Sequence, residues 1–348
     1  MFRVACSVHI KKILEKLMKH MMKVILFVLL AVLILLALYA AYAYFSYNRV
    51  LPQDRPCVDC ATPAHVNGYD LFYRELGADN GLPPVILVHG GPGHSSLSFK
   101  NGFDFLAEET RVIFYDQRGS GNSQIKPNPE DYTIEQLVDE LEALRRDVVK
   151  ADKVILVGHS FGSAVVQRYA IKYPEHVEKM VIAGGIRINN GMNNRFIWKW
   201  FGPALYSTAM GFPPVDPAAA DVWSMQSAEK DNLSRLFDKT NTAILADTGT
   251  LTFAPWLQIS LSVTGADYKT ELSQLQVPTL FIYGTADSPY TGKPVADELC
   301  ATLPNCQSAE FTQSGHWTFL EEPDKFQQVL RDFLKAVISD KSSVISEQ

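Results

Sequence analysis

The sequence predicts an α/β fold: a mostly parallel β-sheet covered by helices on both faces, with a helical insertion and an N-terminal transmembrane helix. Two observations predict it. Runs of Val, Ile and Leu that suit buried parallel strands alternate with amphipathic segments from residue 66 onward. A long uncharged apolar run, residues 24–45, precedes them. With 348 residues and 47% apolar side chains, the chain is long enough to bury a large core.

The N-terminal segment divides into a basic flank and an apolar run. Residues 1–23 carry six basic side chains against one acid, Glu15, and residues 24–45 carry no charge. At about 1.5 Å per residue, this run is long enough to cross a hydrocarbon core of about 30 Å. Because basic flanks stay in the cytoplasm, we predict a single-pass signal anchor with a cytoplasmic N-terminus and the rest of the chain outside. A signal peptide cleaved near the Ala41 and Ala43 pair, which would release a secreted protein, is the alternative.

Charge and cysteine positions agree with an exported domain. The net charge is −6, of which the first 45 residues contribute +5, so the rest carries −11. No basic stripe is present to neutralise phosphates, which argues against nucleic acid as a partner. A redox or metal pair is an alternative for the C-x-x-C spacing, although no second C-x-x-C or histidine cluster supports zinc. The cysteines after the apolar run can form two disulfides, with the pairing left open: Cys57, Cys60, Cys300 and Cys306.

The rest of the chain divides where its pattern changes. Residues 46–65, with three prolines among polar side chains, are predicted to form a stalk. The core is predicted in two parts, residues 66–185 and 276–340, with a tail at 341–348. Between them, residues 186–275 lack the pattern of a buried strand, which predicts a mostly helical cap over the strand ends. We expect most of the many aromatic rings of this cap to form its own core, with a few facing a pocket.

Each core element follows from the local pattern. The stretch VNGYDLFYREL predicts a hairpin at 66–76. Continuous apolar runs predict buried strands at 83–91, 110–119, 153–160, 179–185 and 278–287. Apolar residues at helical spacing predict helices at 132–152, 161–174 and 323–339.

The turn after the predicted strand at 153–160 places a serine between two glycines. Residues 158–162, Gly-His-Ser-Phe-Gly, match G-x-S-x-G in the strand-to-helix context that makes this motif specific. A serine hydroxyl needs a base held by a third group to become a nucleophile. Asp287, at the end of a strand, and His316, before the last helix, supply these groups for Ser160 in the order Ser, Asp, His. A serine that only caps the helix is the simpler alternative.

Two further motifs follow earlier strands. In HGGPG, residues 89–93, the glycines can aim a backbone N–H at a developing oxyanion, and we assign this role to Gly91 together with the N–H of Phe161. The motif DQRGSGNS contains Asp116 and Arg118, which we expect to fix loops beneath the site. No metal ion and no organic cofactor is expected.

With these three motifs the sequence resembles the α/β-hydrolase superfamily from about Val66 to Ile338, and within it the proline iminopeptidase branch, peptidase family S33. The resemblance implies an α/β-hydrolase fold and a serine hydrolase acting through an acyl-enzyme, with aminopeptidase activity on a short peptide or small molecule. Family members of this type carry a Trp-Glu pair in the cap, whose acid holds the ammonium group of the substrate. The similar stretch here is VWSMQSAEKD, in which Gln226 stands near the position of that acid. The candidate substrate contacts are therefore Trp223, Asp221 and Glu229.

Other functions remain as alternatives. A general carboxylesterase, amidase or lactonase of the same fold would share the HGGPG motif. A non-catalytic binding ectodomain is the remote alternative, because a fold does not by itself give a function. Epoxide hydrolases and dehalogenases of this fold use an aspartate at the position of Ser160, so they are excluded.

Overall fold

The chain forms two units in its described residues. The computed structural model describes residues 2–187, 195–246, 249–263 and 267–336. Helix α1 (Phe2–Tyr47) and most of helix α4 (Arg195–Met210) belong to the first unit, and the described strands belong to the second. The first unit comprises Met1–Arg49 with Lys199–Phe212, and the second comprises Val50–Trp198 with Pro213–Gln348.

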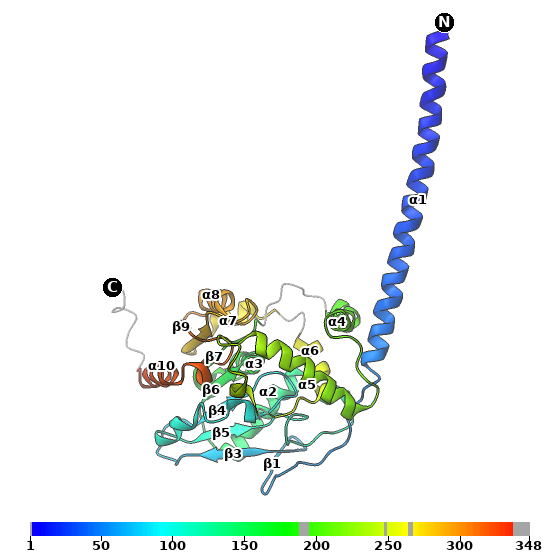
Figure 1. Ribbon diagram of the computed structural model, residues 1–348. Coiled ribbons are helices and arrows are strands. Elements are labelled where there is room, and N and C mark those ends of the chain that lie inside the picture. The colour runs from blue at the N-terminus through cyan, green and yellow to red at the C-terminus, as the bar shows by residue number, and fades with distance from the viewer. Residues whose placement is uncertain (1, 188–194, 247–248, 264–266, 337–348) are drawn as a thin grey trace, which may run out of the picture. The chain divides into compact units, whose positions relative to one another are not determined.

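A seven-stranded sheet organises the second unit (Figure 1). Its strands follow the order β3-β5-β4-β6-β7-β8-β9, and every neighbouring pair is parallel except β3 with β5. This arrangement confirms the predicted α/β fold with a mostly parallel sheet. The bounds are β3 Tyr73–Leu76, β4 Val85–Val88, β5 Val112–Tyr115, β6 Val154–His159, β7 Val177–Ala183, β8 Thr279–Gly284 and β9 Cys306–Phe311.

Alternate side chains of the central strands pack into two separate apolar cores. In β4, Ile86 and Val88 join one core, while Val85 and Leu87 join the other. Strands buried on both faces need apolar residues at every position, which explains their continuous Val, Ile and Leu runs. The first core includes residues of α2 (Ile134–Ala143), α3 (Gly162–Lys172) and α8 (Lys293–Thr302), and the second those of α9 (Thr318–Glu321) and α10 (Pro323–Lys335).

The sheet differs from the sequence prediction at its two edges. A hairpin forms over residues 64–71 rather than the predicted 66–76, from β1 (Ala64–Val66) and β2 (Tyr69–Leu71), with Asn67 and Gly68 at positive φ in its turn. The rest of the predicted hairpin, β3, pairs with β5 in the main sheet. Strand β9, at the other edge, was not predicted, because most of its side chains are at least partly exposed and it has no apolar run. Pairing with β8, rather than local pattern, defines it.

In its described residues, the interval 186–275 consists of helices joined by loops and turns and has no strand. Besides α4 it contains α5 (Pro217–Ser234), α6 (Phe253–Val263), α7 (Lys269–Gln274) and a short 3₁₀ turn. The described aromatic rings of this interval differ in burial. Phe253 is fully buried, but Phe201, Phe212 and Phe237 are exposed. Part of the reason is that rings of the α4 segment contact the tyrosines of α1 instead.

Helix α1 is long and apolar enough to cross a membrane (Figure 1). Its candidate span covers Leu14–Tyr47, with a mean hydropathy of 3.2 in the most apolar window. Its large apolar side chains are exposed over most of this length, whereas Ala40, Ala43 and Tyr47 near its end are buried.

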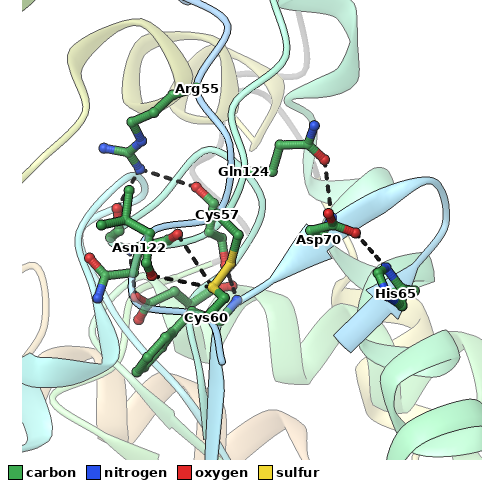
Figure 2. Close-up of a disulfide and its surroundings, with 12 residues drawn as sticks. Arg55, Cys57, Cys60, His65, Asp70, Asn122 and Gln124 are labelled. Carbon is green, nitrogen blue, oxygen red and sulfur yellow. Dashed lines mark hydrogen bonds and ion pairs between the residues drawn. A yellow bond between two sulfur atoms is a disulfide. The ribbon is translucent and has the colours of Figure 1, made fainter. Parts of the chain in front are cut away.

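The segment predicted as a stalk is bonded to the loop at residues 121–125 (Figure 2). The backbone of Arg55 exchanges hydrogen bonds of 3.0 and 2.8 Å with Ile125, and its guanidinium donates to two carbonyls of the loop. Disulfides pair Cys57 with Cys60 in this segment and Cys300 with Cys306 between α8 and β9. Each pair closes a short local loop, which answers the pairing that the sequence left open.

Candidate active site

Ser160 lies in the sharp turn between β6 and α3. Its φ is +53°, in the left-handed region that strains a residue with a side chain. A Cβ at Gly158 would lie 2.7 Å from the carbonyl oxygen of Gly162, and a Cβ at Gly162 would lie 2.0 Å from that of Val88. Both flanking positions therefore require glycine, because neighbouring backbone fills the space of a side chain. A helix cap alone does not require this degree of crowding.

Three segments with candidate residues meet at one edge of the sheet. Ser160 follows β6, Asp287 follows β8, and the glycine-rich turn follows β4. These strands are linked in parallel through β6 and β7. Their carboxyl ends therefore lie at the same edge, where open α/β sheets bind ligands.

Asp287 and His316 form a buried pair at this edge. His316 Nδ1 lies 2.8 Å from Asp287 Oδ2, and the two side chains are 2% and 0% exposed. The other carboxylate oxygen, Oδ1, accepts hydrogen bonds from the N–H of Ser288 at 2.6 Å and the hydroxyl of Thr291 at 2.9 Å. A carboxylate fixed in this way holds the proton of the imidazole on Nδ1 and leaves Nε2 able to accept one.

The end of β7 brings this pair close to Ser160. The N–H of Ser160 donates to the carbonyl of Ala183 at 3.0 Å, and a Cβ on the next residue, Gly184, would lie 2.8 Å from His316 Nδ1. The ring of His159 lies 4.7 Å from that of His316. No hydrogen bond joins Ser160 Oγ to the His316 ring within the described chain, and such bonds often tighten only when substrate binds.

The glycine-rich turn passes directly beside Ser160. A Cβ at Gly90 would lie 2.5 Å from the Cβ of Ser160 and 3.3 Å from its Oγ. The next residue, Gly91, has a φ of +45°. His89 anchors the turn: its Nε2 accepts the N–H of Gln117 at 3.2 Å, and burial lowers its pKa to about 4, so it is neutral. Phe161 directly follows Ser160, and Gly91 directly follows Gly90, the residue that packs against Ser160.

Asp116 and Arg118 form the structural bonds expected of them. Asp116 accepts the N–H of Ser96 on one oxygen at 2.6 Å and that of Asn122 on the other at 2.8 Å. The carboxylate therefore ties the loop after the glycine-rich turn to the loop at 121–125. Arg118 forms a buried ion pair of 2.8 Å with Glu140.

The structure separates the three candidate substrate contacts. Asp221 Oδ1 accepts the N–H of Phe253, the first residue of α6, at 2.7 Å, and burial raises the pKa of this carboxyl. Trp223 packs edge-on against Phe253, with ring centroids 5.6 Å apart. This segment adjoins the glycine-rich turn, since the N–H of Thr252 donates to the carbonyl of Gly93 at 2.8 Å. Glu229 is exposed farther along α5.

A charged residue that the sequence does not single out reaches the Asp287–His316 pair. Arg235, just after α5, places Nη2 3.2 Å from Asp287 Oδ1 and 3.0 Å from His316 Nδ1, and donates to the Thr291 hydroxyl at 2.6 Å. Its carbonyl accepts the N–H of His316 at 3.0 Å. Arg235 stands 52 residues before Asp287 among other charged residues, so no local signal identifies it.

Glu321 of α9 fastens the Arg235 segment to the His316 loop. One carboxylate oxygen accepts the N–H of Phe237 at 2.7 Å, and the other accepts that of Gly315 at 2.8 Å. A Cβ at Gly315 would lie only 1.7 Å from the carbonyl oxygen of Arg235. The contact between the cap and the base is therefore close-packed backbone.

Opposing effects set the protonation of the pair. Burial raises the pKa of Asp287, but the His316 ring and the Arg235 guanidinium outweigh it and hold that pKa well below its usual range. Burial and then Arg235 lower the pKa of His316, while Asp287 acts in the opposite direction. His316 is thus neutral at pH 7, the form that accepts a proton. Within the described residues, no three His, Cys, Asp or Glu side chains are grouped to hold a metal ion.

Comparison with known proteins agrees with the fold described above. A family model for the alpha/beta hydrolase fold matches residues 83–323. The proline iminopeptidase of Thermoplasma volcanium is 25% identical over 296 residues, which cover 78% of this chain and 95% of the relative. That of Lactobacillus helveticus is 29% identical over 293 residues, covering 77% of this chain and 95% of the relative.

Solved structures agree on the fold. The enol-lactonase from Burkholderia xenovorans LB400 superposes with a TM-score of 0.61 at 23% identity, covering 79% of this chain and 100% of the lactonase. An esterase from Exiguobacterium antarcticum gives 0.62 at 19% identity, covering 78% of this chain and 97% of the esterase. Because both structures are less than 25% identical to this chain, the likeness shows a shared fold.

Proposed function

This chain belongs to the alpha/beta hydrolase family, and on that premise we propose that it is a membrane-anchored serine hydrolase that cleaves an amide or ester bond through an acyl-enzyme. Ser160 is the nucleophile, His316 the base and Asp287 the group that orients the base. The observation that carries the proposal is the buried Asp287–His316 hydrogen bond at the sheet edge that also holds the strained Ser160.

In the proposed mechanism, Ser160 Oγ attacks the substrate carbonyl while His316 Nε2 takes the hydroxyl proton. The backbone N–H groups of Gly91 and Phe161 stabilise the negative oxygen that forms. The same proton passes to the leaving amine or alcohol as the C–N or C–O bond breaks. Water then gives a proton to His316 and attacks the acyl carbon. As the bond between that carbon and Ser160 Oγ breaks, His316 returns the proton to Oγ, which frees the acid and restores Ser160.

We further propose that the substrate is the N-terminal end of a short peptide. The proline iminopeptidases support this, because they are similar to this chain over nearly their whole length. An aminopeptidase has to bind the ammonium group of its substrate. Burying that cation without a carboxylate partner costs several kcal/mol of binding free energy. Asp221 is the candidate acid nearest to the segment that adjoins the glycine-rich turn.

A carboxylesterase, amidase or lactonase is the second candidate, and three features of the site favour it. The carboxylate of Asp221 already accepts a backbone N–H, Glu229 is exposed, and the charge beside the proposed base is a cation, Arg235. An ester or lactone needs no binding site for an ammonium group.

The variant Asp221→Asn separates these substrates. Asparagine keeps an oxygen to accept the Phe253 N–H but removes the negative charge. For an aminopeptidase, we expect KM for an aminoacyl substrate with a free amine to rise at least about ten-fold, the size of one lost charged hydrogen bond. The same substrate with an acetylated amine should be unaffected in steady-state assays.

Glu229→Gln is the matched comparison, because it removes the charge of the other candidate acid on α5. The acid that binds the amine is the one whose loss raises KM only for the free-amine substrate. Equal cleavage of free and acetylated substrates, with neither variant altering KM, would replace the aminopeptidase proposal with the esterase or amidase alternative.

The proposed orientation places the N-terminus in the cytoplasm and the hydrolase outside. The basic flank before residue 24 and the apolar length of α1 support it. Protease added to the outside of intact cells is therefore expected to digest the chain beyond Arg49, while an N-terminal tag stays protected. The reverse pattern would contradict this orientation, and a soluble product beginning near Tyr44 would support the secreted alternative.

A further inference from the structure

We propose that α4 is a second membrane-contact element, whose apolar face inserts into the outer lipid–water interface beside the end of α1. This apolar face of α4 consists of Phe201 and Leu205, and Phe212 follows just beyond the end of the helix. The proposal rests on the membrane anchoring proposed above, and its partner is a phospholipid bilayer at the boundary between headgroups and acyl chains.

The α4 segment is bonded to the last turns of α1. The hydroxyls of Tyr39 and Ser207 lie 2.5 Å apart, and the hydroxyl of Tyr47 donates to the carbonyl of Gly211 at 2.6 Å. Ring contacts join the same segments: Phe212 with Tyr39, Tyr42 and Tyr47, Trp200 with Tyr44, and Tyr206 with Tyr47.

One stripe of α1 is buried at this end of the helix. Ala40, Ala43 and Tyr47 are buried, and they recur at the spacing of one helix face. Alanine leaves room for a neighbouring helix to approach closely. Unlike the preceding turns of α1, this end therefore has protein around part of its surface.

The apolar face of α4 is exposed although it carries no charge. Phe201 and Leu205 are 47% and 55% exposed, and their spacing of four residues places them on one side of the helix. Phe212, just beyond the helix, is 38% exposed. The only charged residue in 199–212 is Lys199. A helix face turned to water normally carries charged side chains, whereas an exposed apolar stripe with aromatic residues is typical of a helix lying in a membrane interface.

The contacts of α4 with α1 set its depth. A hydrocarbon core of about 30 Å takes up about 20 helical residues. If the uncharged run 24–45 spans it, the tyrosines from Tyr39 to Tyr47 lie at the outer boundary, where amphipathic rings concentrate. Since α4 contacts these tyrosines, it lies at the same depth, and its exposed apolar face continues the lipid-facing surface of α1. This continuity favours lipid over a protein partner.

Depth-dependent quenching of the full-length protein tests this. The chain is reconstituted into phosphatidylcholine vesicles on a Cys6→Ser background, so that an added cysteine is the only free thiol beside the two disulfides. A fluorescent probe is attached at Phe201→Cys or Leu205→Cys, with Leu30→Cys in α1 as the positive control. Val222→Cys, exposed on α5 in the other unit, is the matched negative control.

Phospholipids brominated in their acyl chains are expected to quench the probe at positions 201 and 205, as they do at position 30, while position 222 keeps its fluorescence. Quenching at 30 with none at 201 and 205 would overturn the proposal for α4 and leave the anchor intact. No quenching at 30 would overturn the anchor itself. A probe at 205 that is shielded from water but not quenched by lipid, in a particle of doubled size, would assign the face to a second copy of the chain.

Discussion

Replacement of Ser160 by alanine is expected to lower kcat by about 10⁴-fold or more without unfolding the chain. The hydroxyl is the group that attacks the substrate carbonyl in the proposed mechanism, and its loss leaves only the contribution of the oxyanion donors and of substrate binding. Alanine fits the strained turn as well as serine does, so the circular dichroism spectrum should not change. The measurement is kcat on any substrate that the wild-type enzyme hydrolyses.

A fluorophosphonate probe gives an independent readout, because it reacts with an activated serine hydroxyl. Wild-type protein should be labelled at Ser160, and Ser160→Ala should not be labelled at all. Ser273→Ala, a matched serine exposed on α7, should keep both labelling and activity. Full activity of Ser160→Ala, or labelling that persists in it, would rule out the proposed nucleophile.

The central sheet could be predicted from sequence because its strands are buried on both faces. Each residue of β4 and of β6 contacts one core or the other or lies buried between them, so local composition alone identifies these strands. β9 could not be predicted in this way. It carries Gln307, Ser308 and Glu310 at an exposed edge, and its pairing with β8 depends on residues about 27 positions away.

The aromatic residues of the cap show a similar limit. Their number predicts a hydrophobic core, but it does not say which surface they cover. The bond between Tyr39 and Ser207 joins residues 168 positions apart, and Trp200 packs against Tyr44 of α1. The local sequence pattern cannot predict a contact between residues so far apart.

Some residues of the candidate site could be predicted from local sequence, and one could not. Ser160 and its flanking glycines could be predicted because the strained turn has strict local requirements, and Asp287 and His316 followed from chain order in a known fold pattern. Arg235 could not, because only the folding of the cap onto the His316 loop gives an ordinary surface-type residue its position beside the base.

Replacement of Asp287 by asparagine is expected to lower kcat by about 10⁴-fold at neutral pH, as expected when a base loses its orienting carboxylate. The asparagine amide would donate to Nδ1 of His316, which favours the tautomer with the proton on Nε2, and that nitrogen can then no longer accept the proton of Ser160. Arg235 adds to this effect. Its Nη2 lies 3.0 Å from Nδ1, and once the carboxylate is lost its positive charge is unopposed and can also donate there.

Arg235→Gln tests this account through the pH profile of kcat/KM. In the otherwise intact enzyme it removes a positive charge that lowers the pKa of His316, so that pKa rises and the acid limb of the profile moves to higher pH. Arg146→Gln, exposed and paired with Asp147, is the matched control and should leave the limb in place. In the Asp287→Asn background, Arg235→Gln should recover part of the lost activity, because one of the two donors to Nδ1 is gone. An acid limb that does not move in Arg235→Gln, together with no recovery in the double variant, would show that Arg235 acts only in packing the cap against the His316 loop.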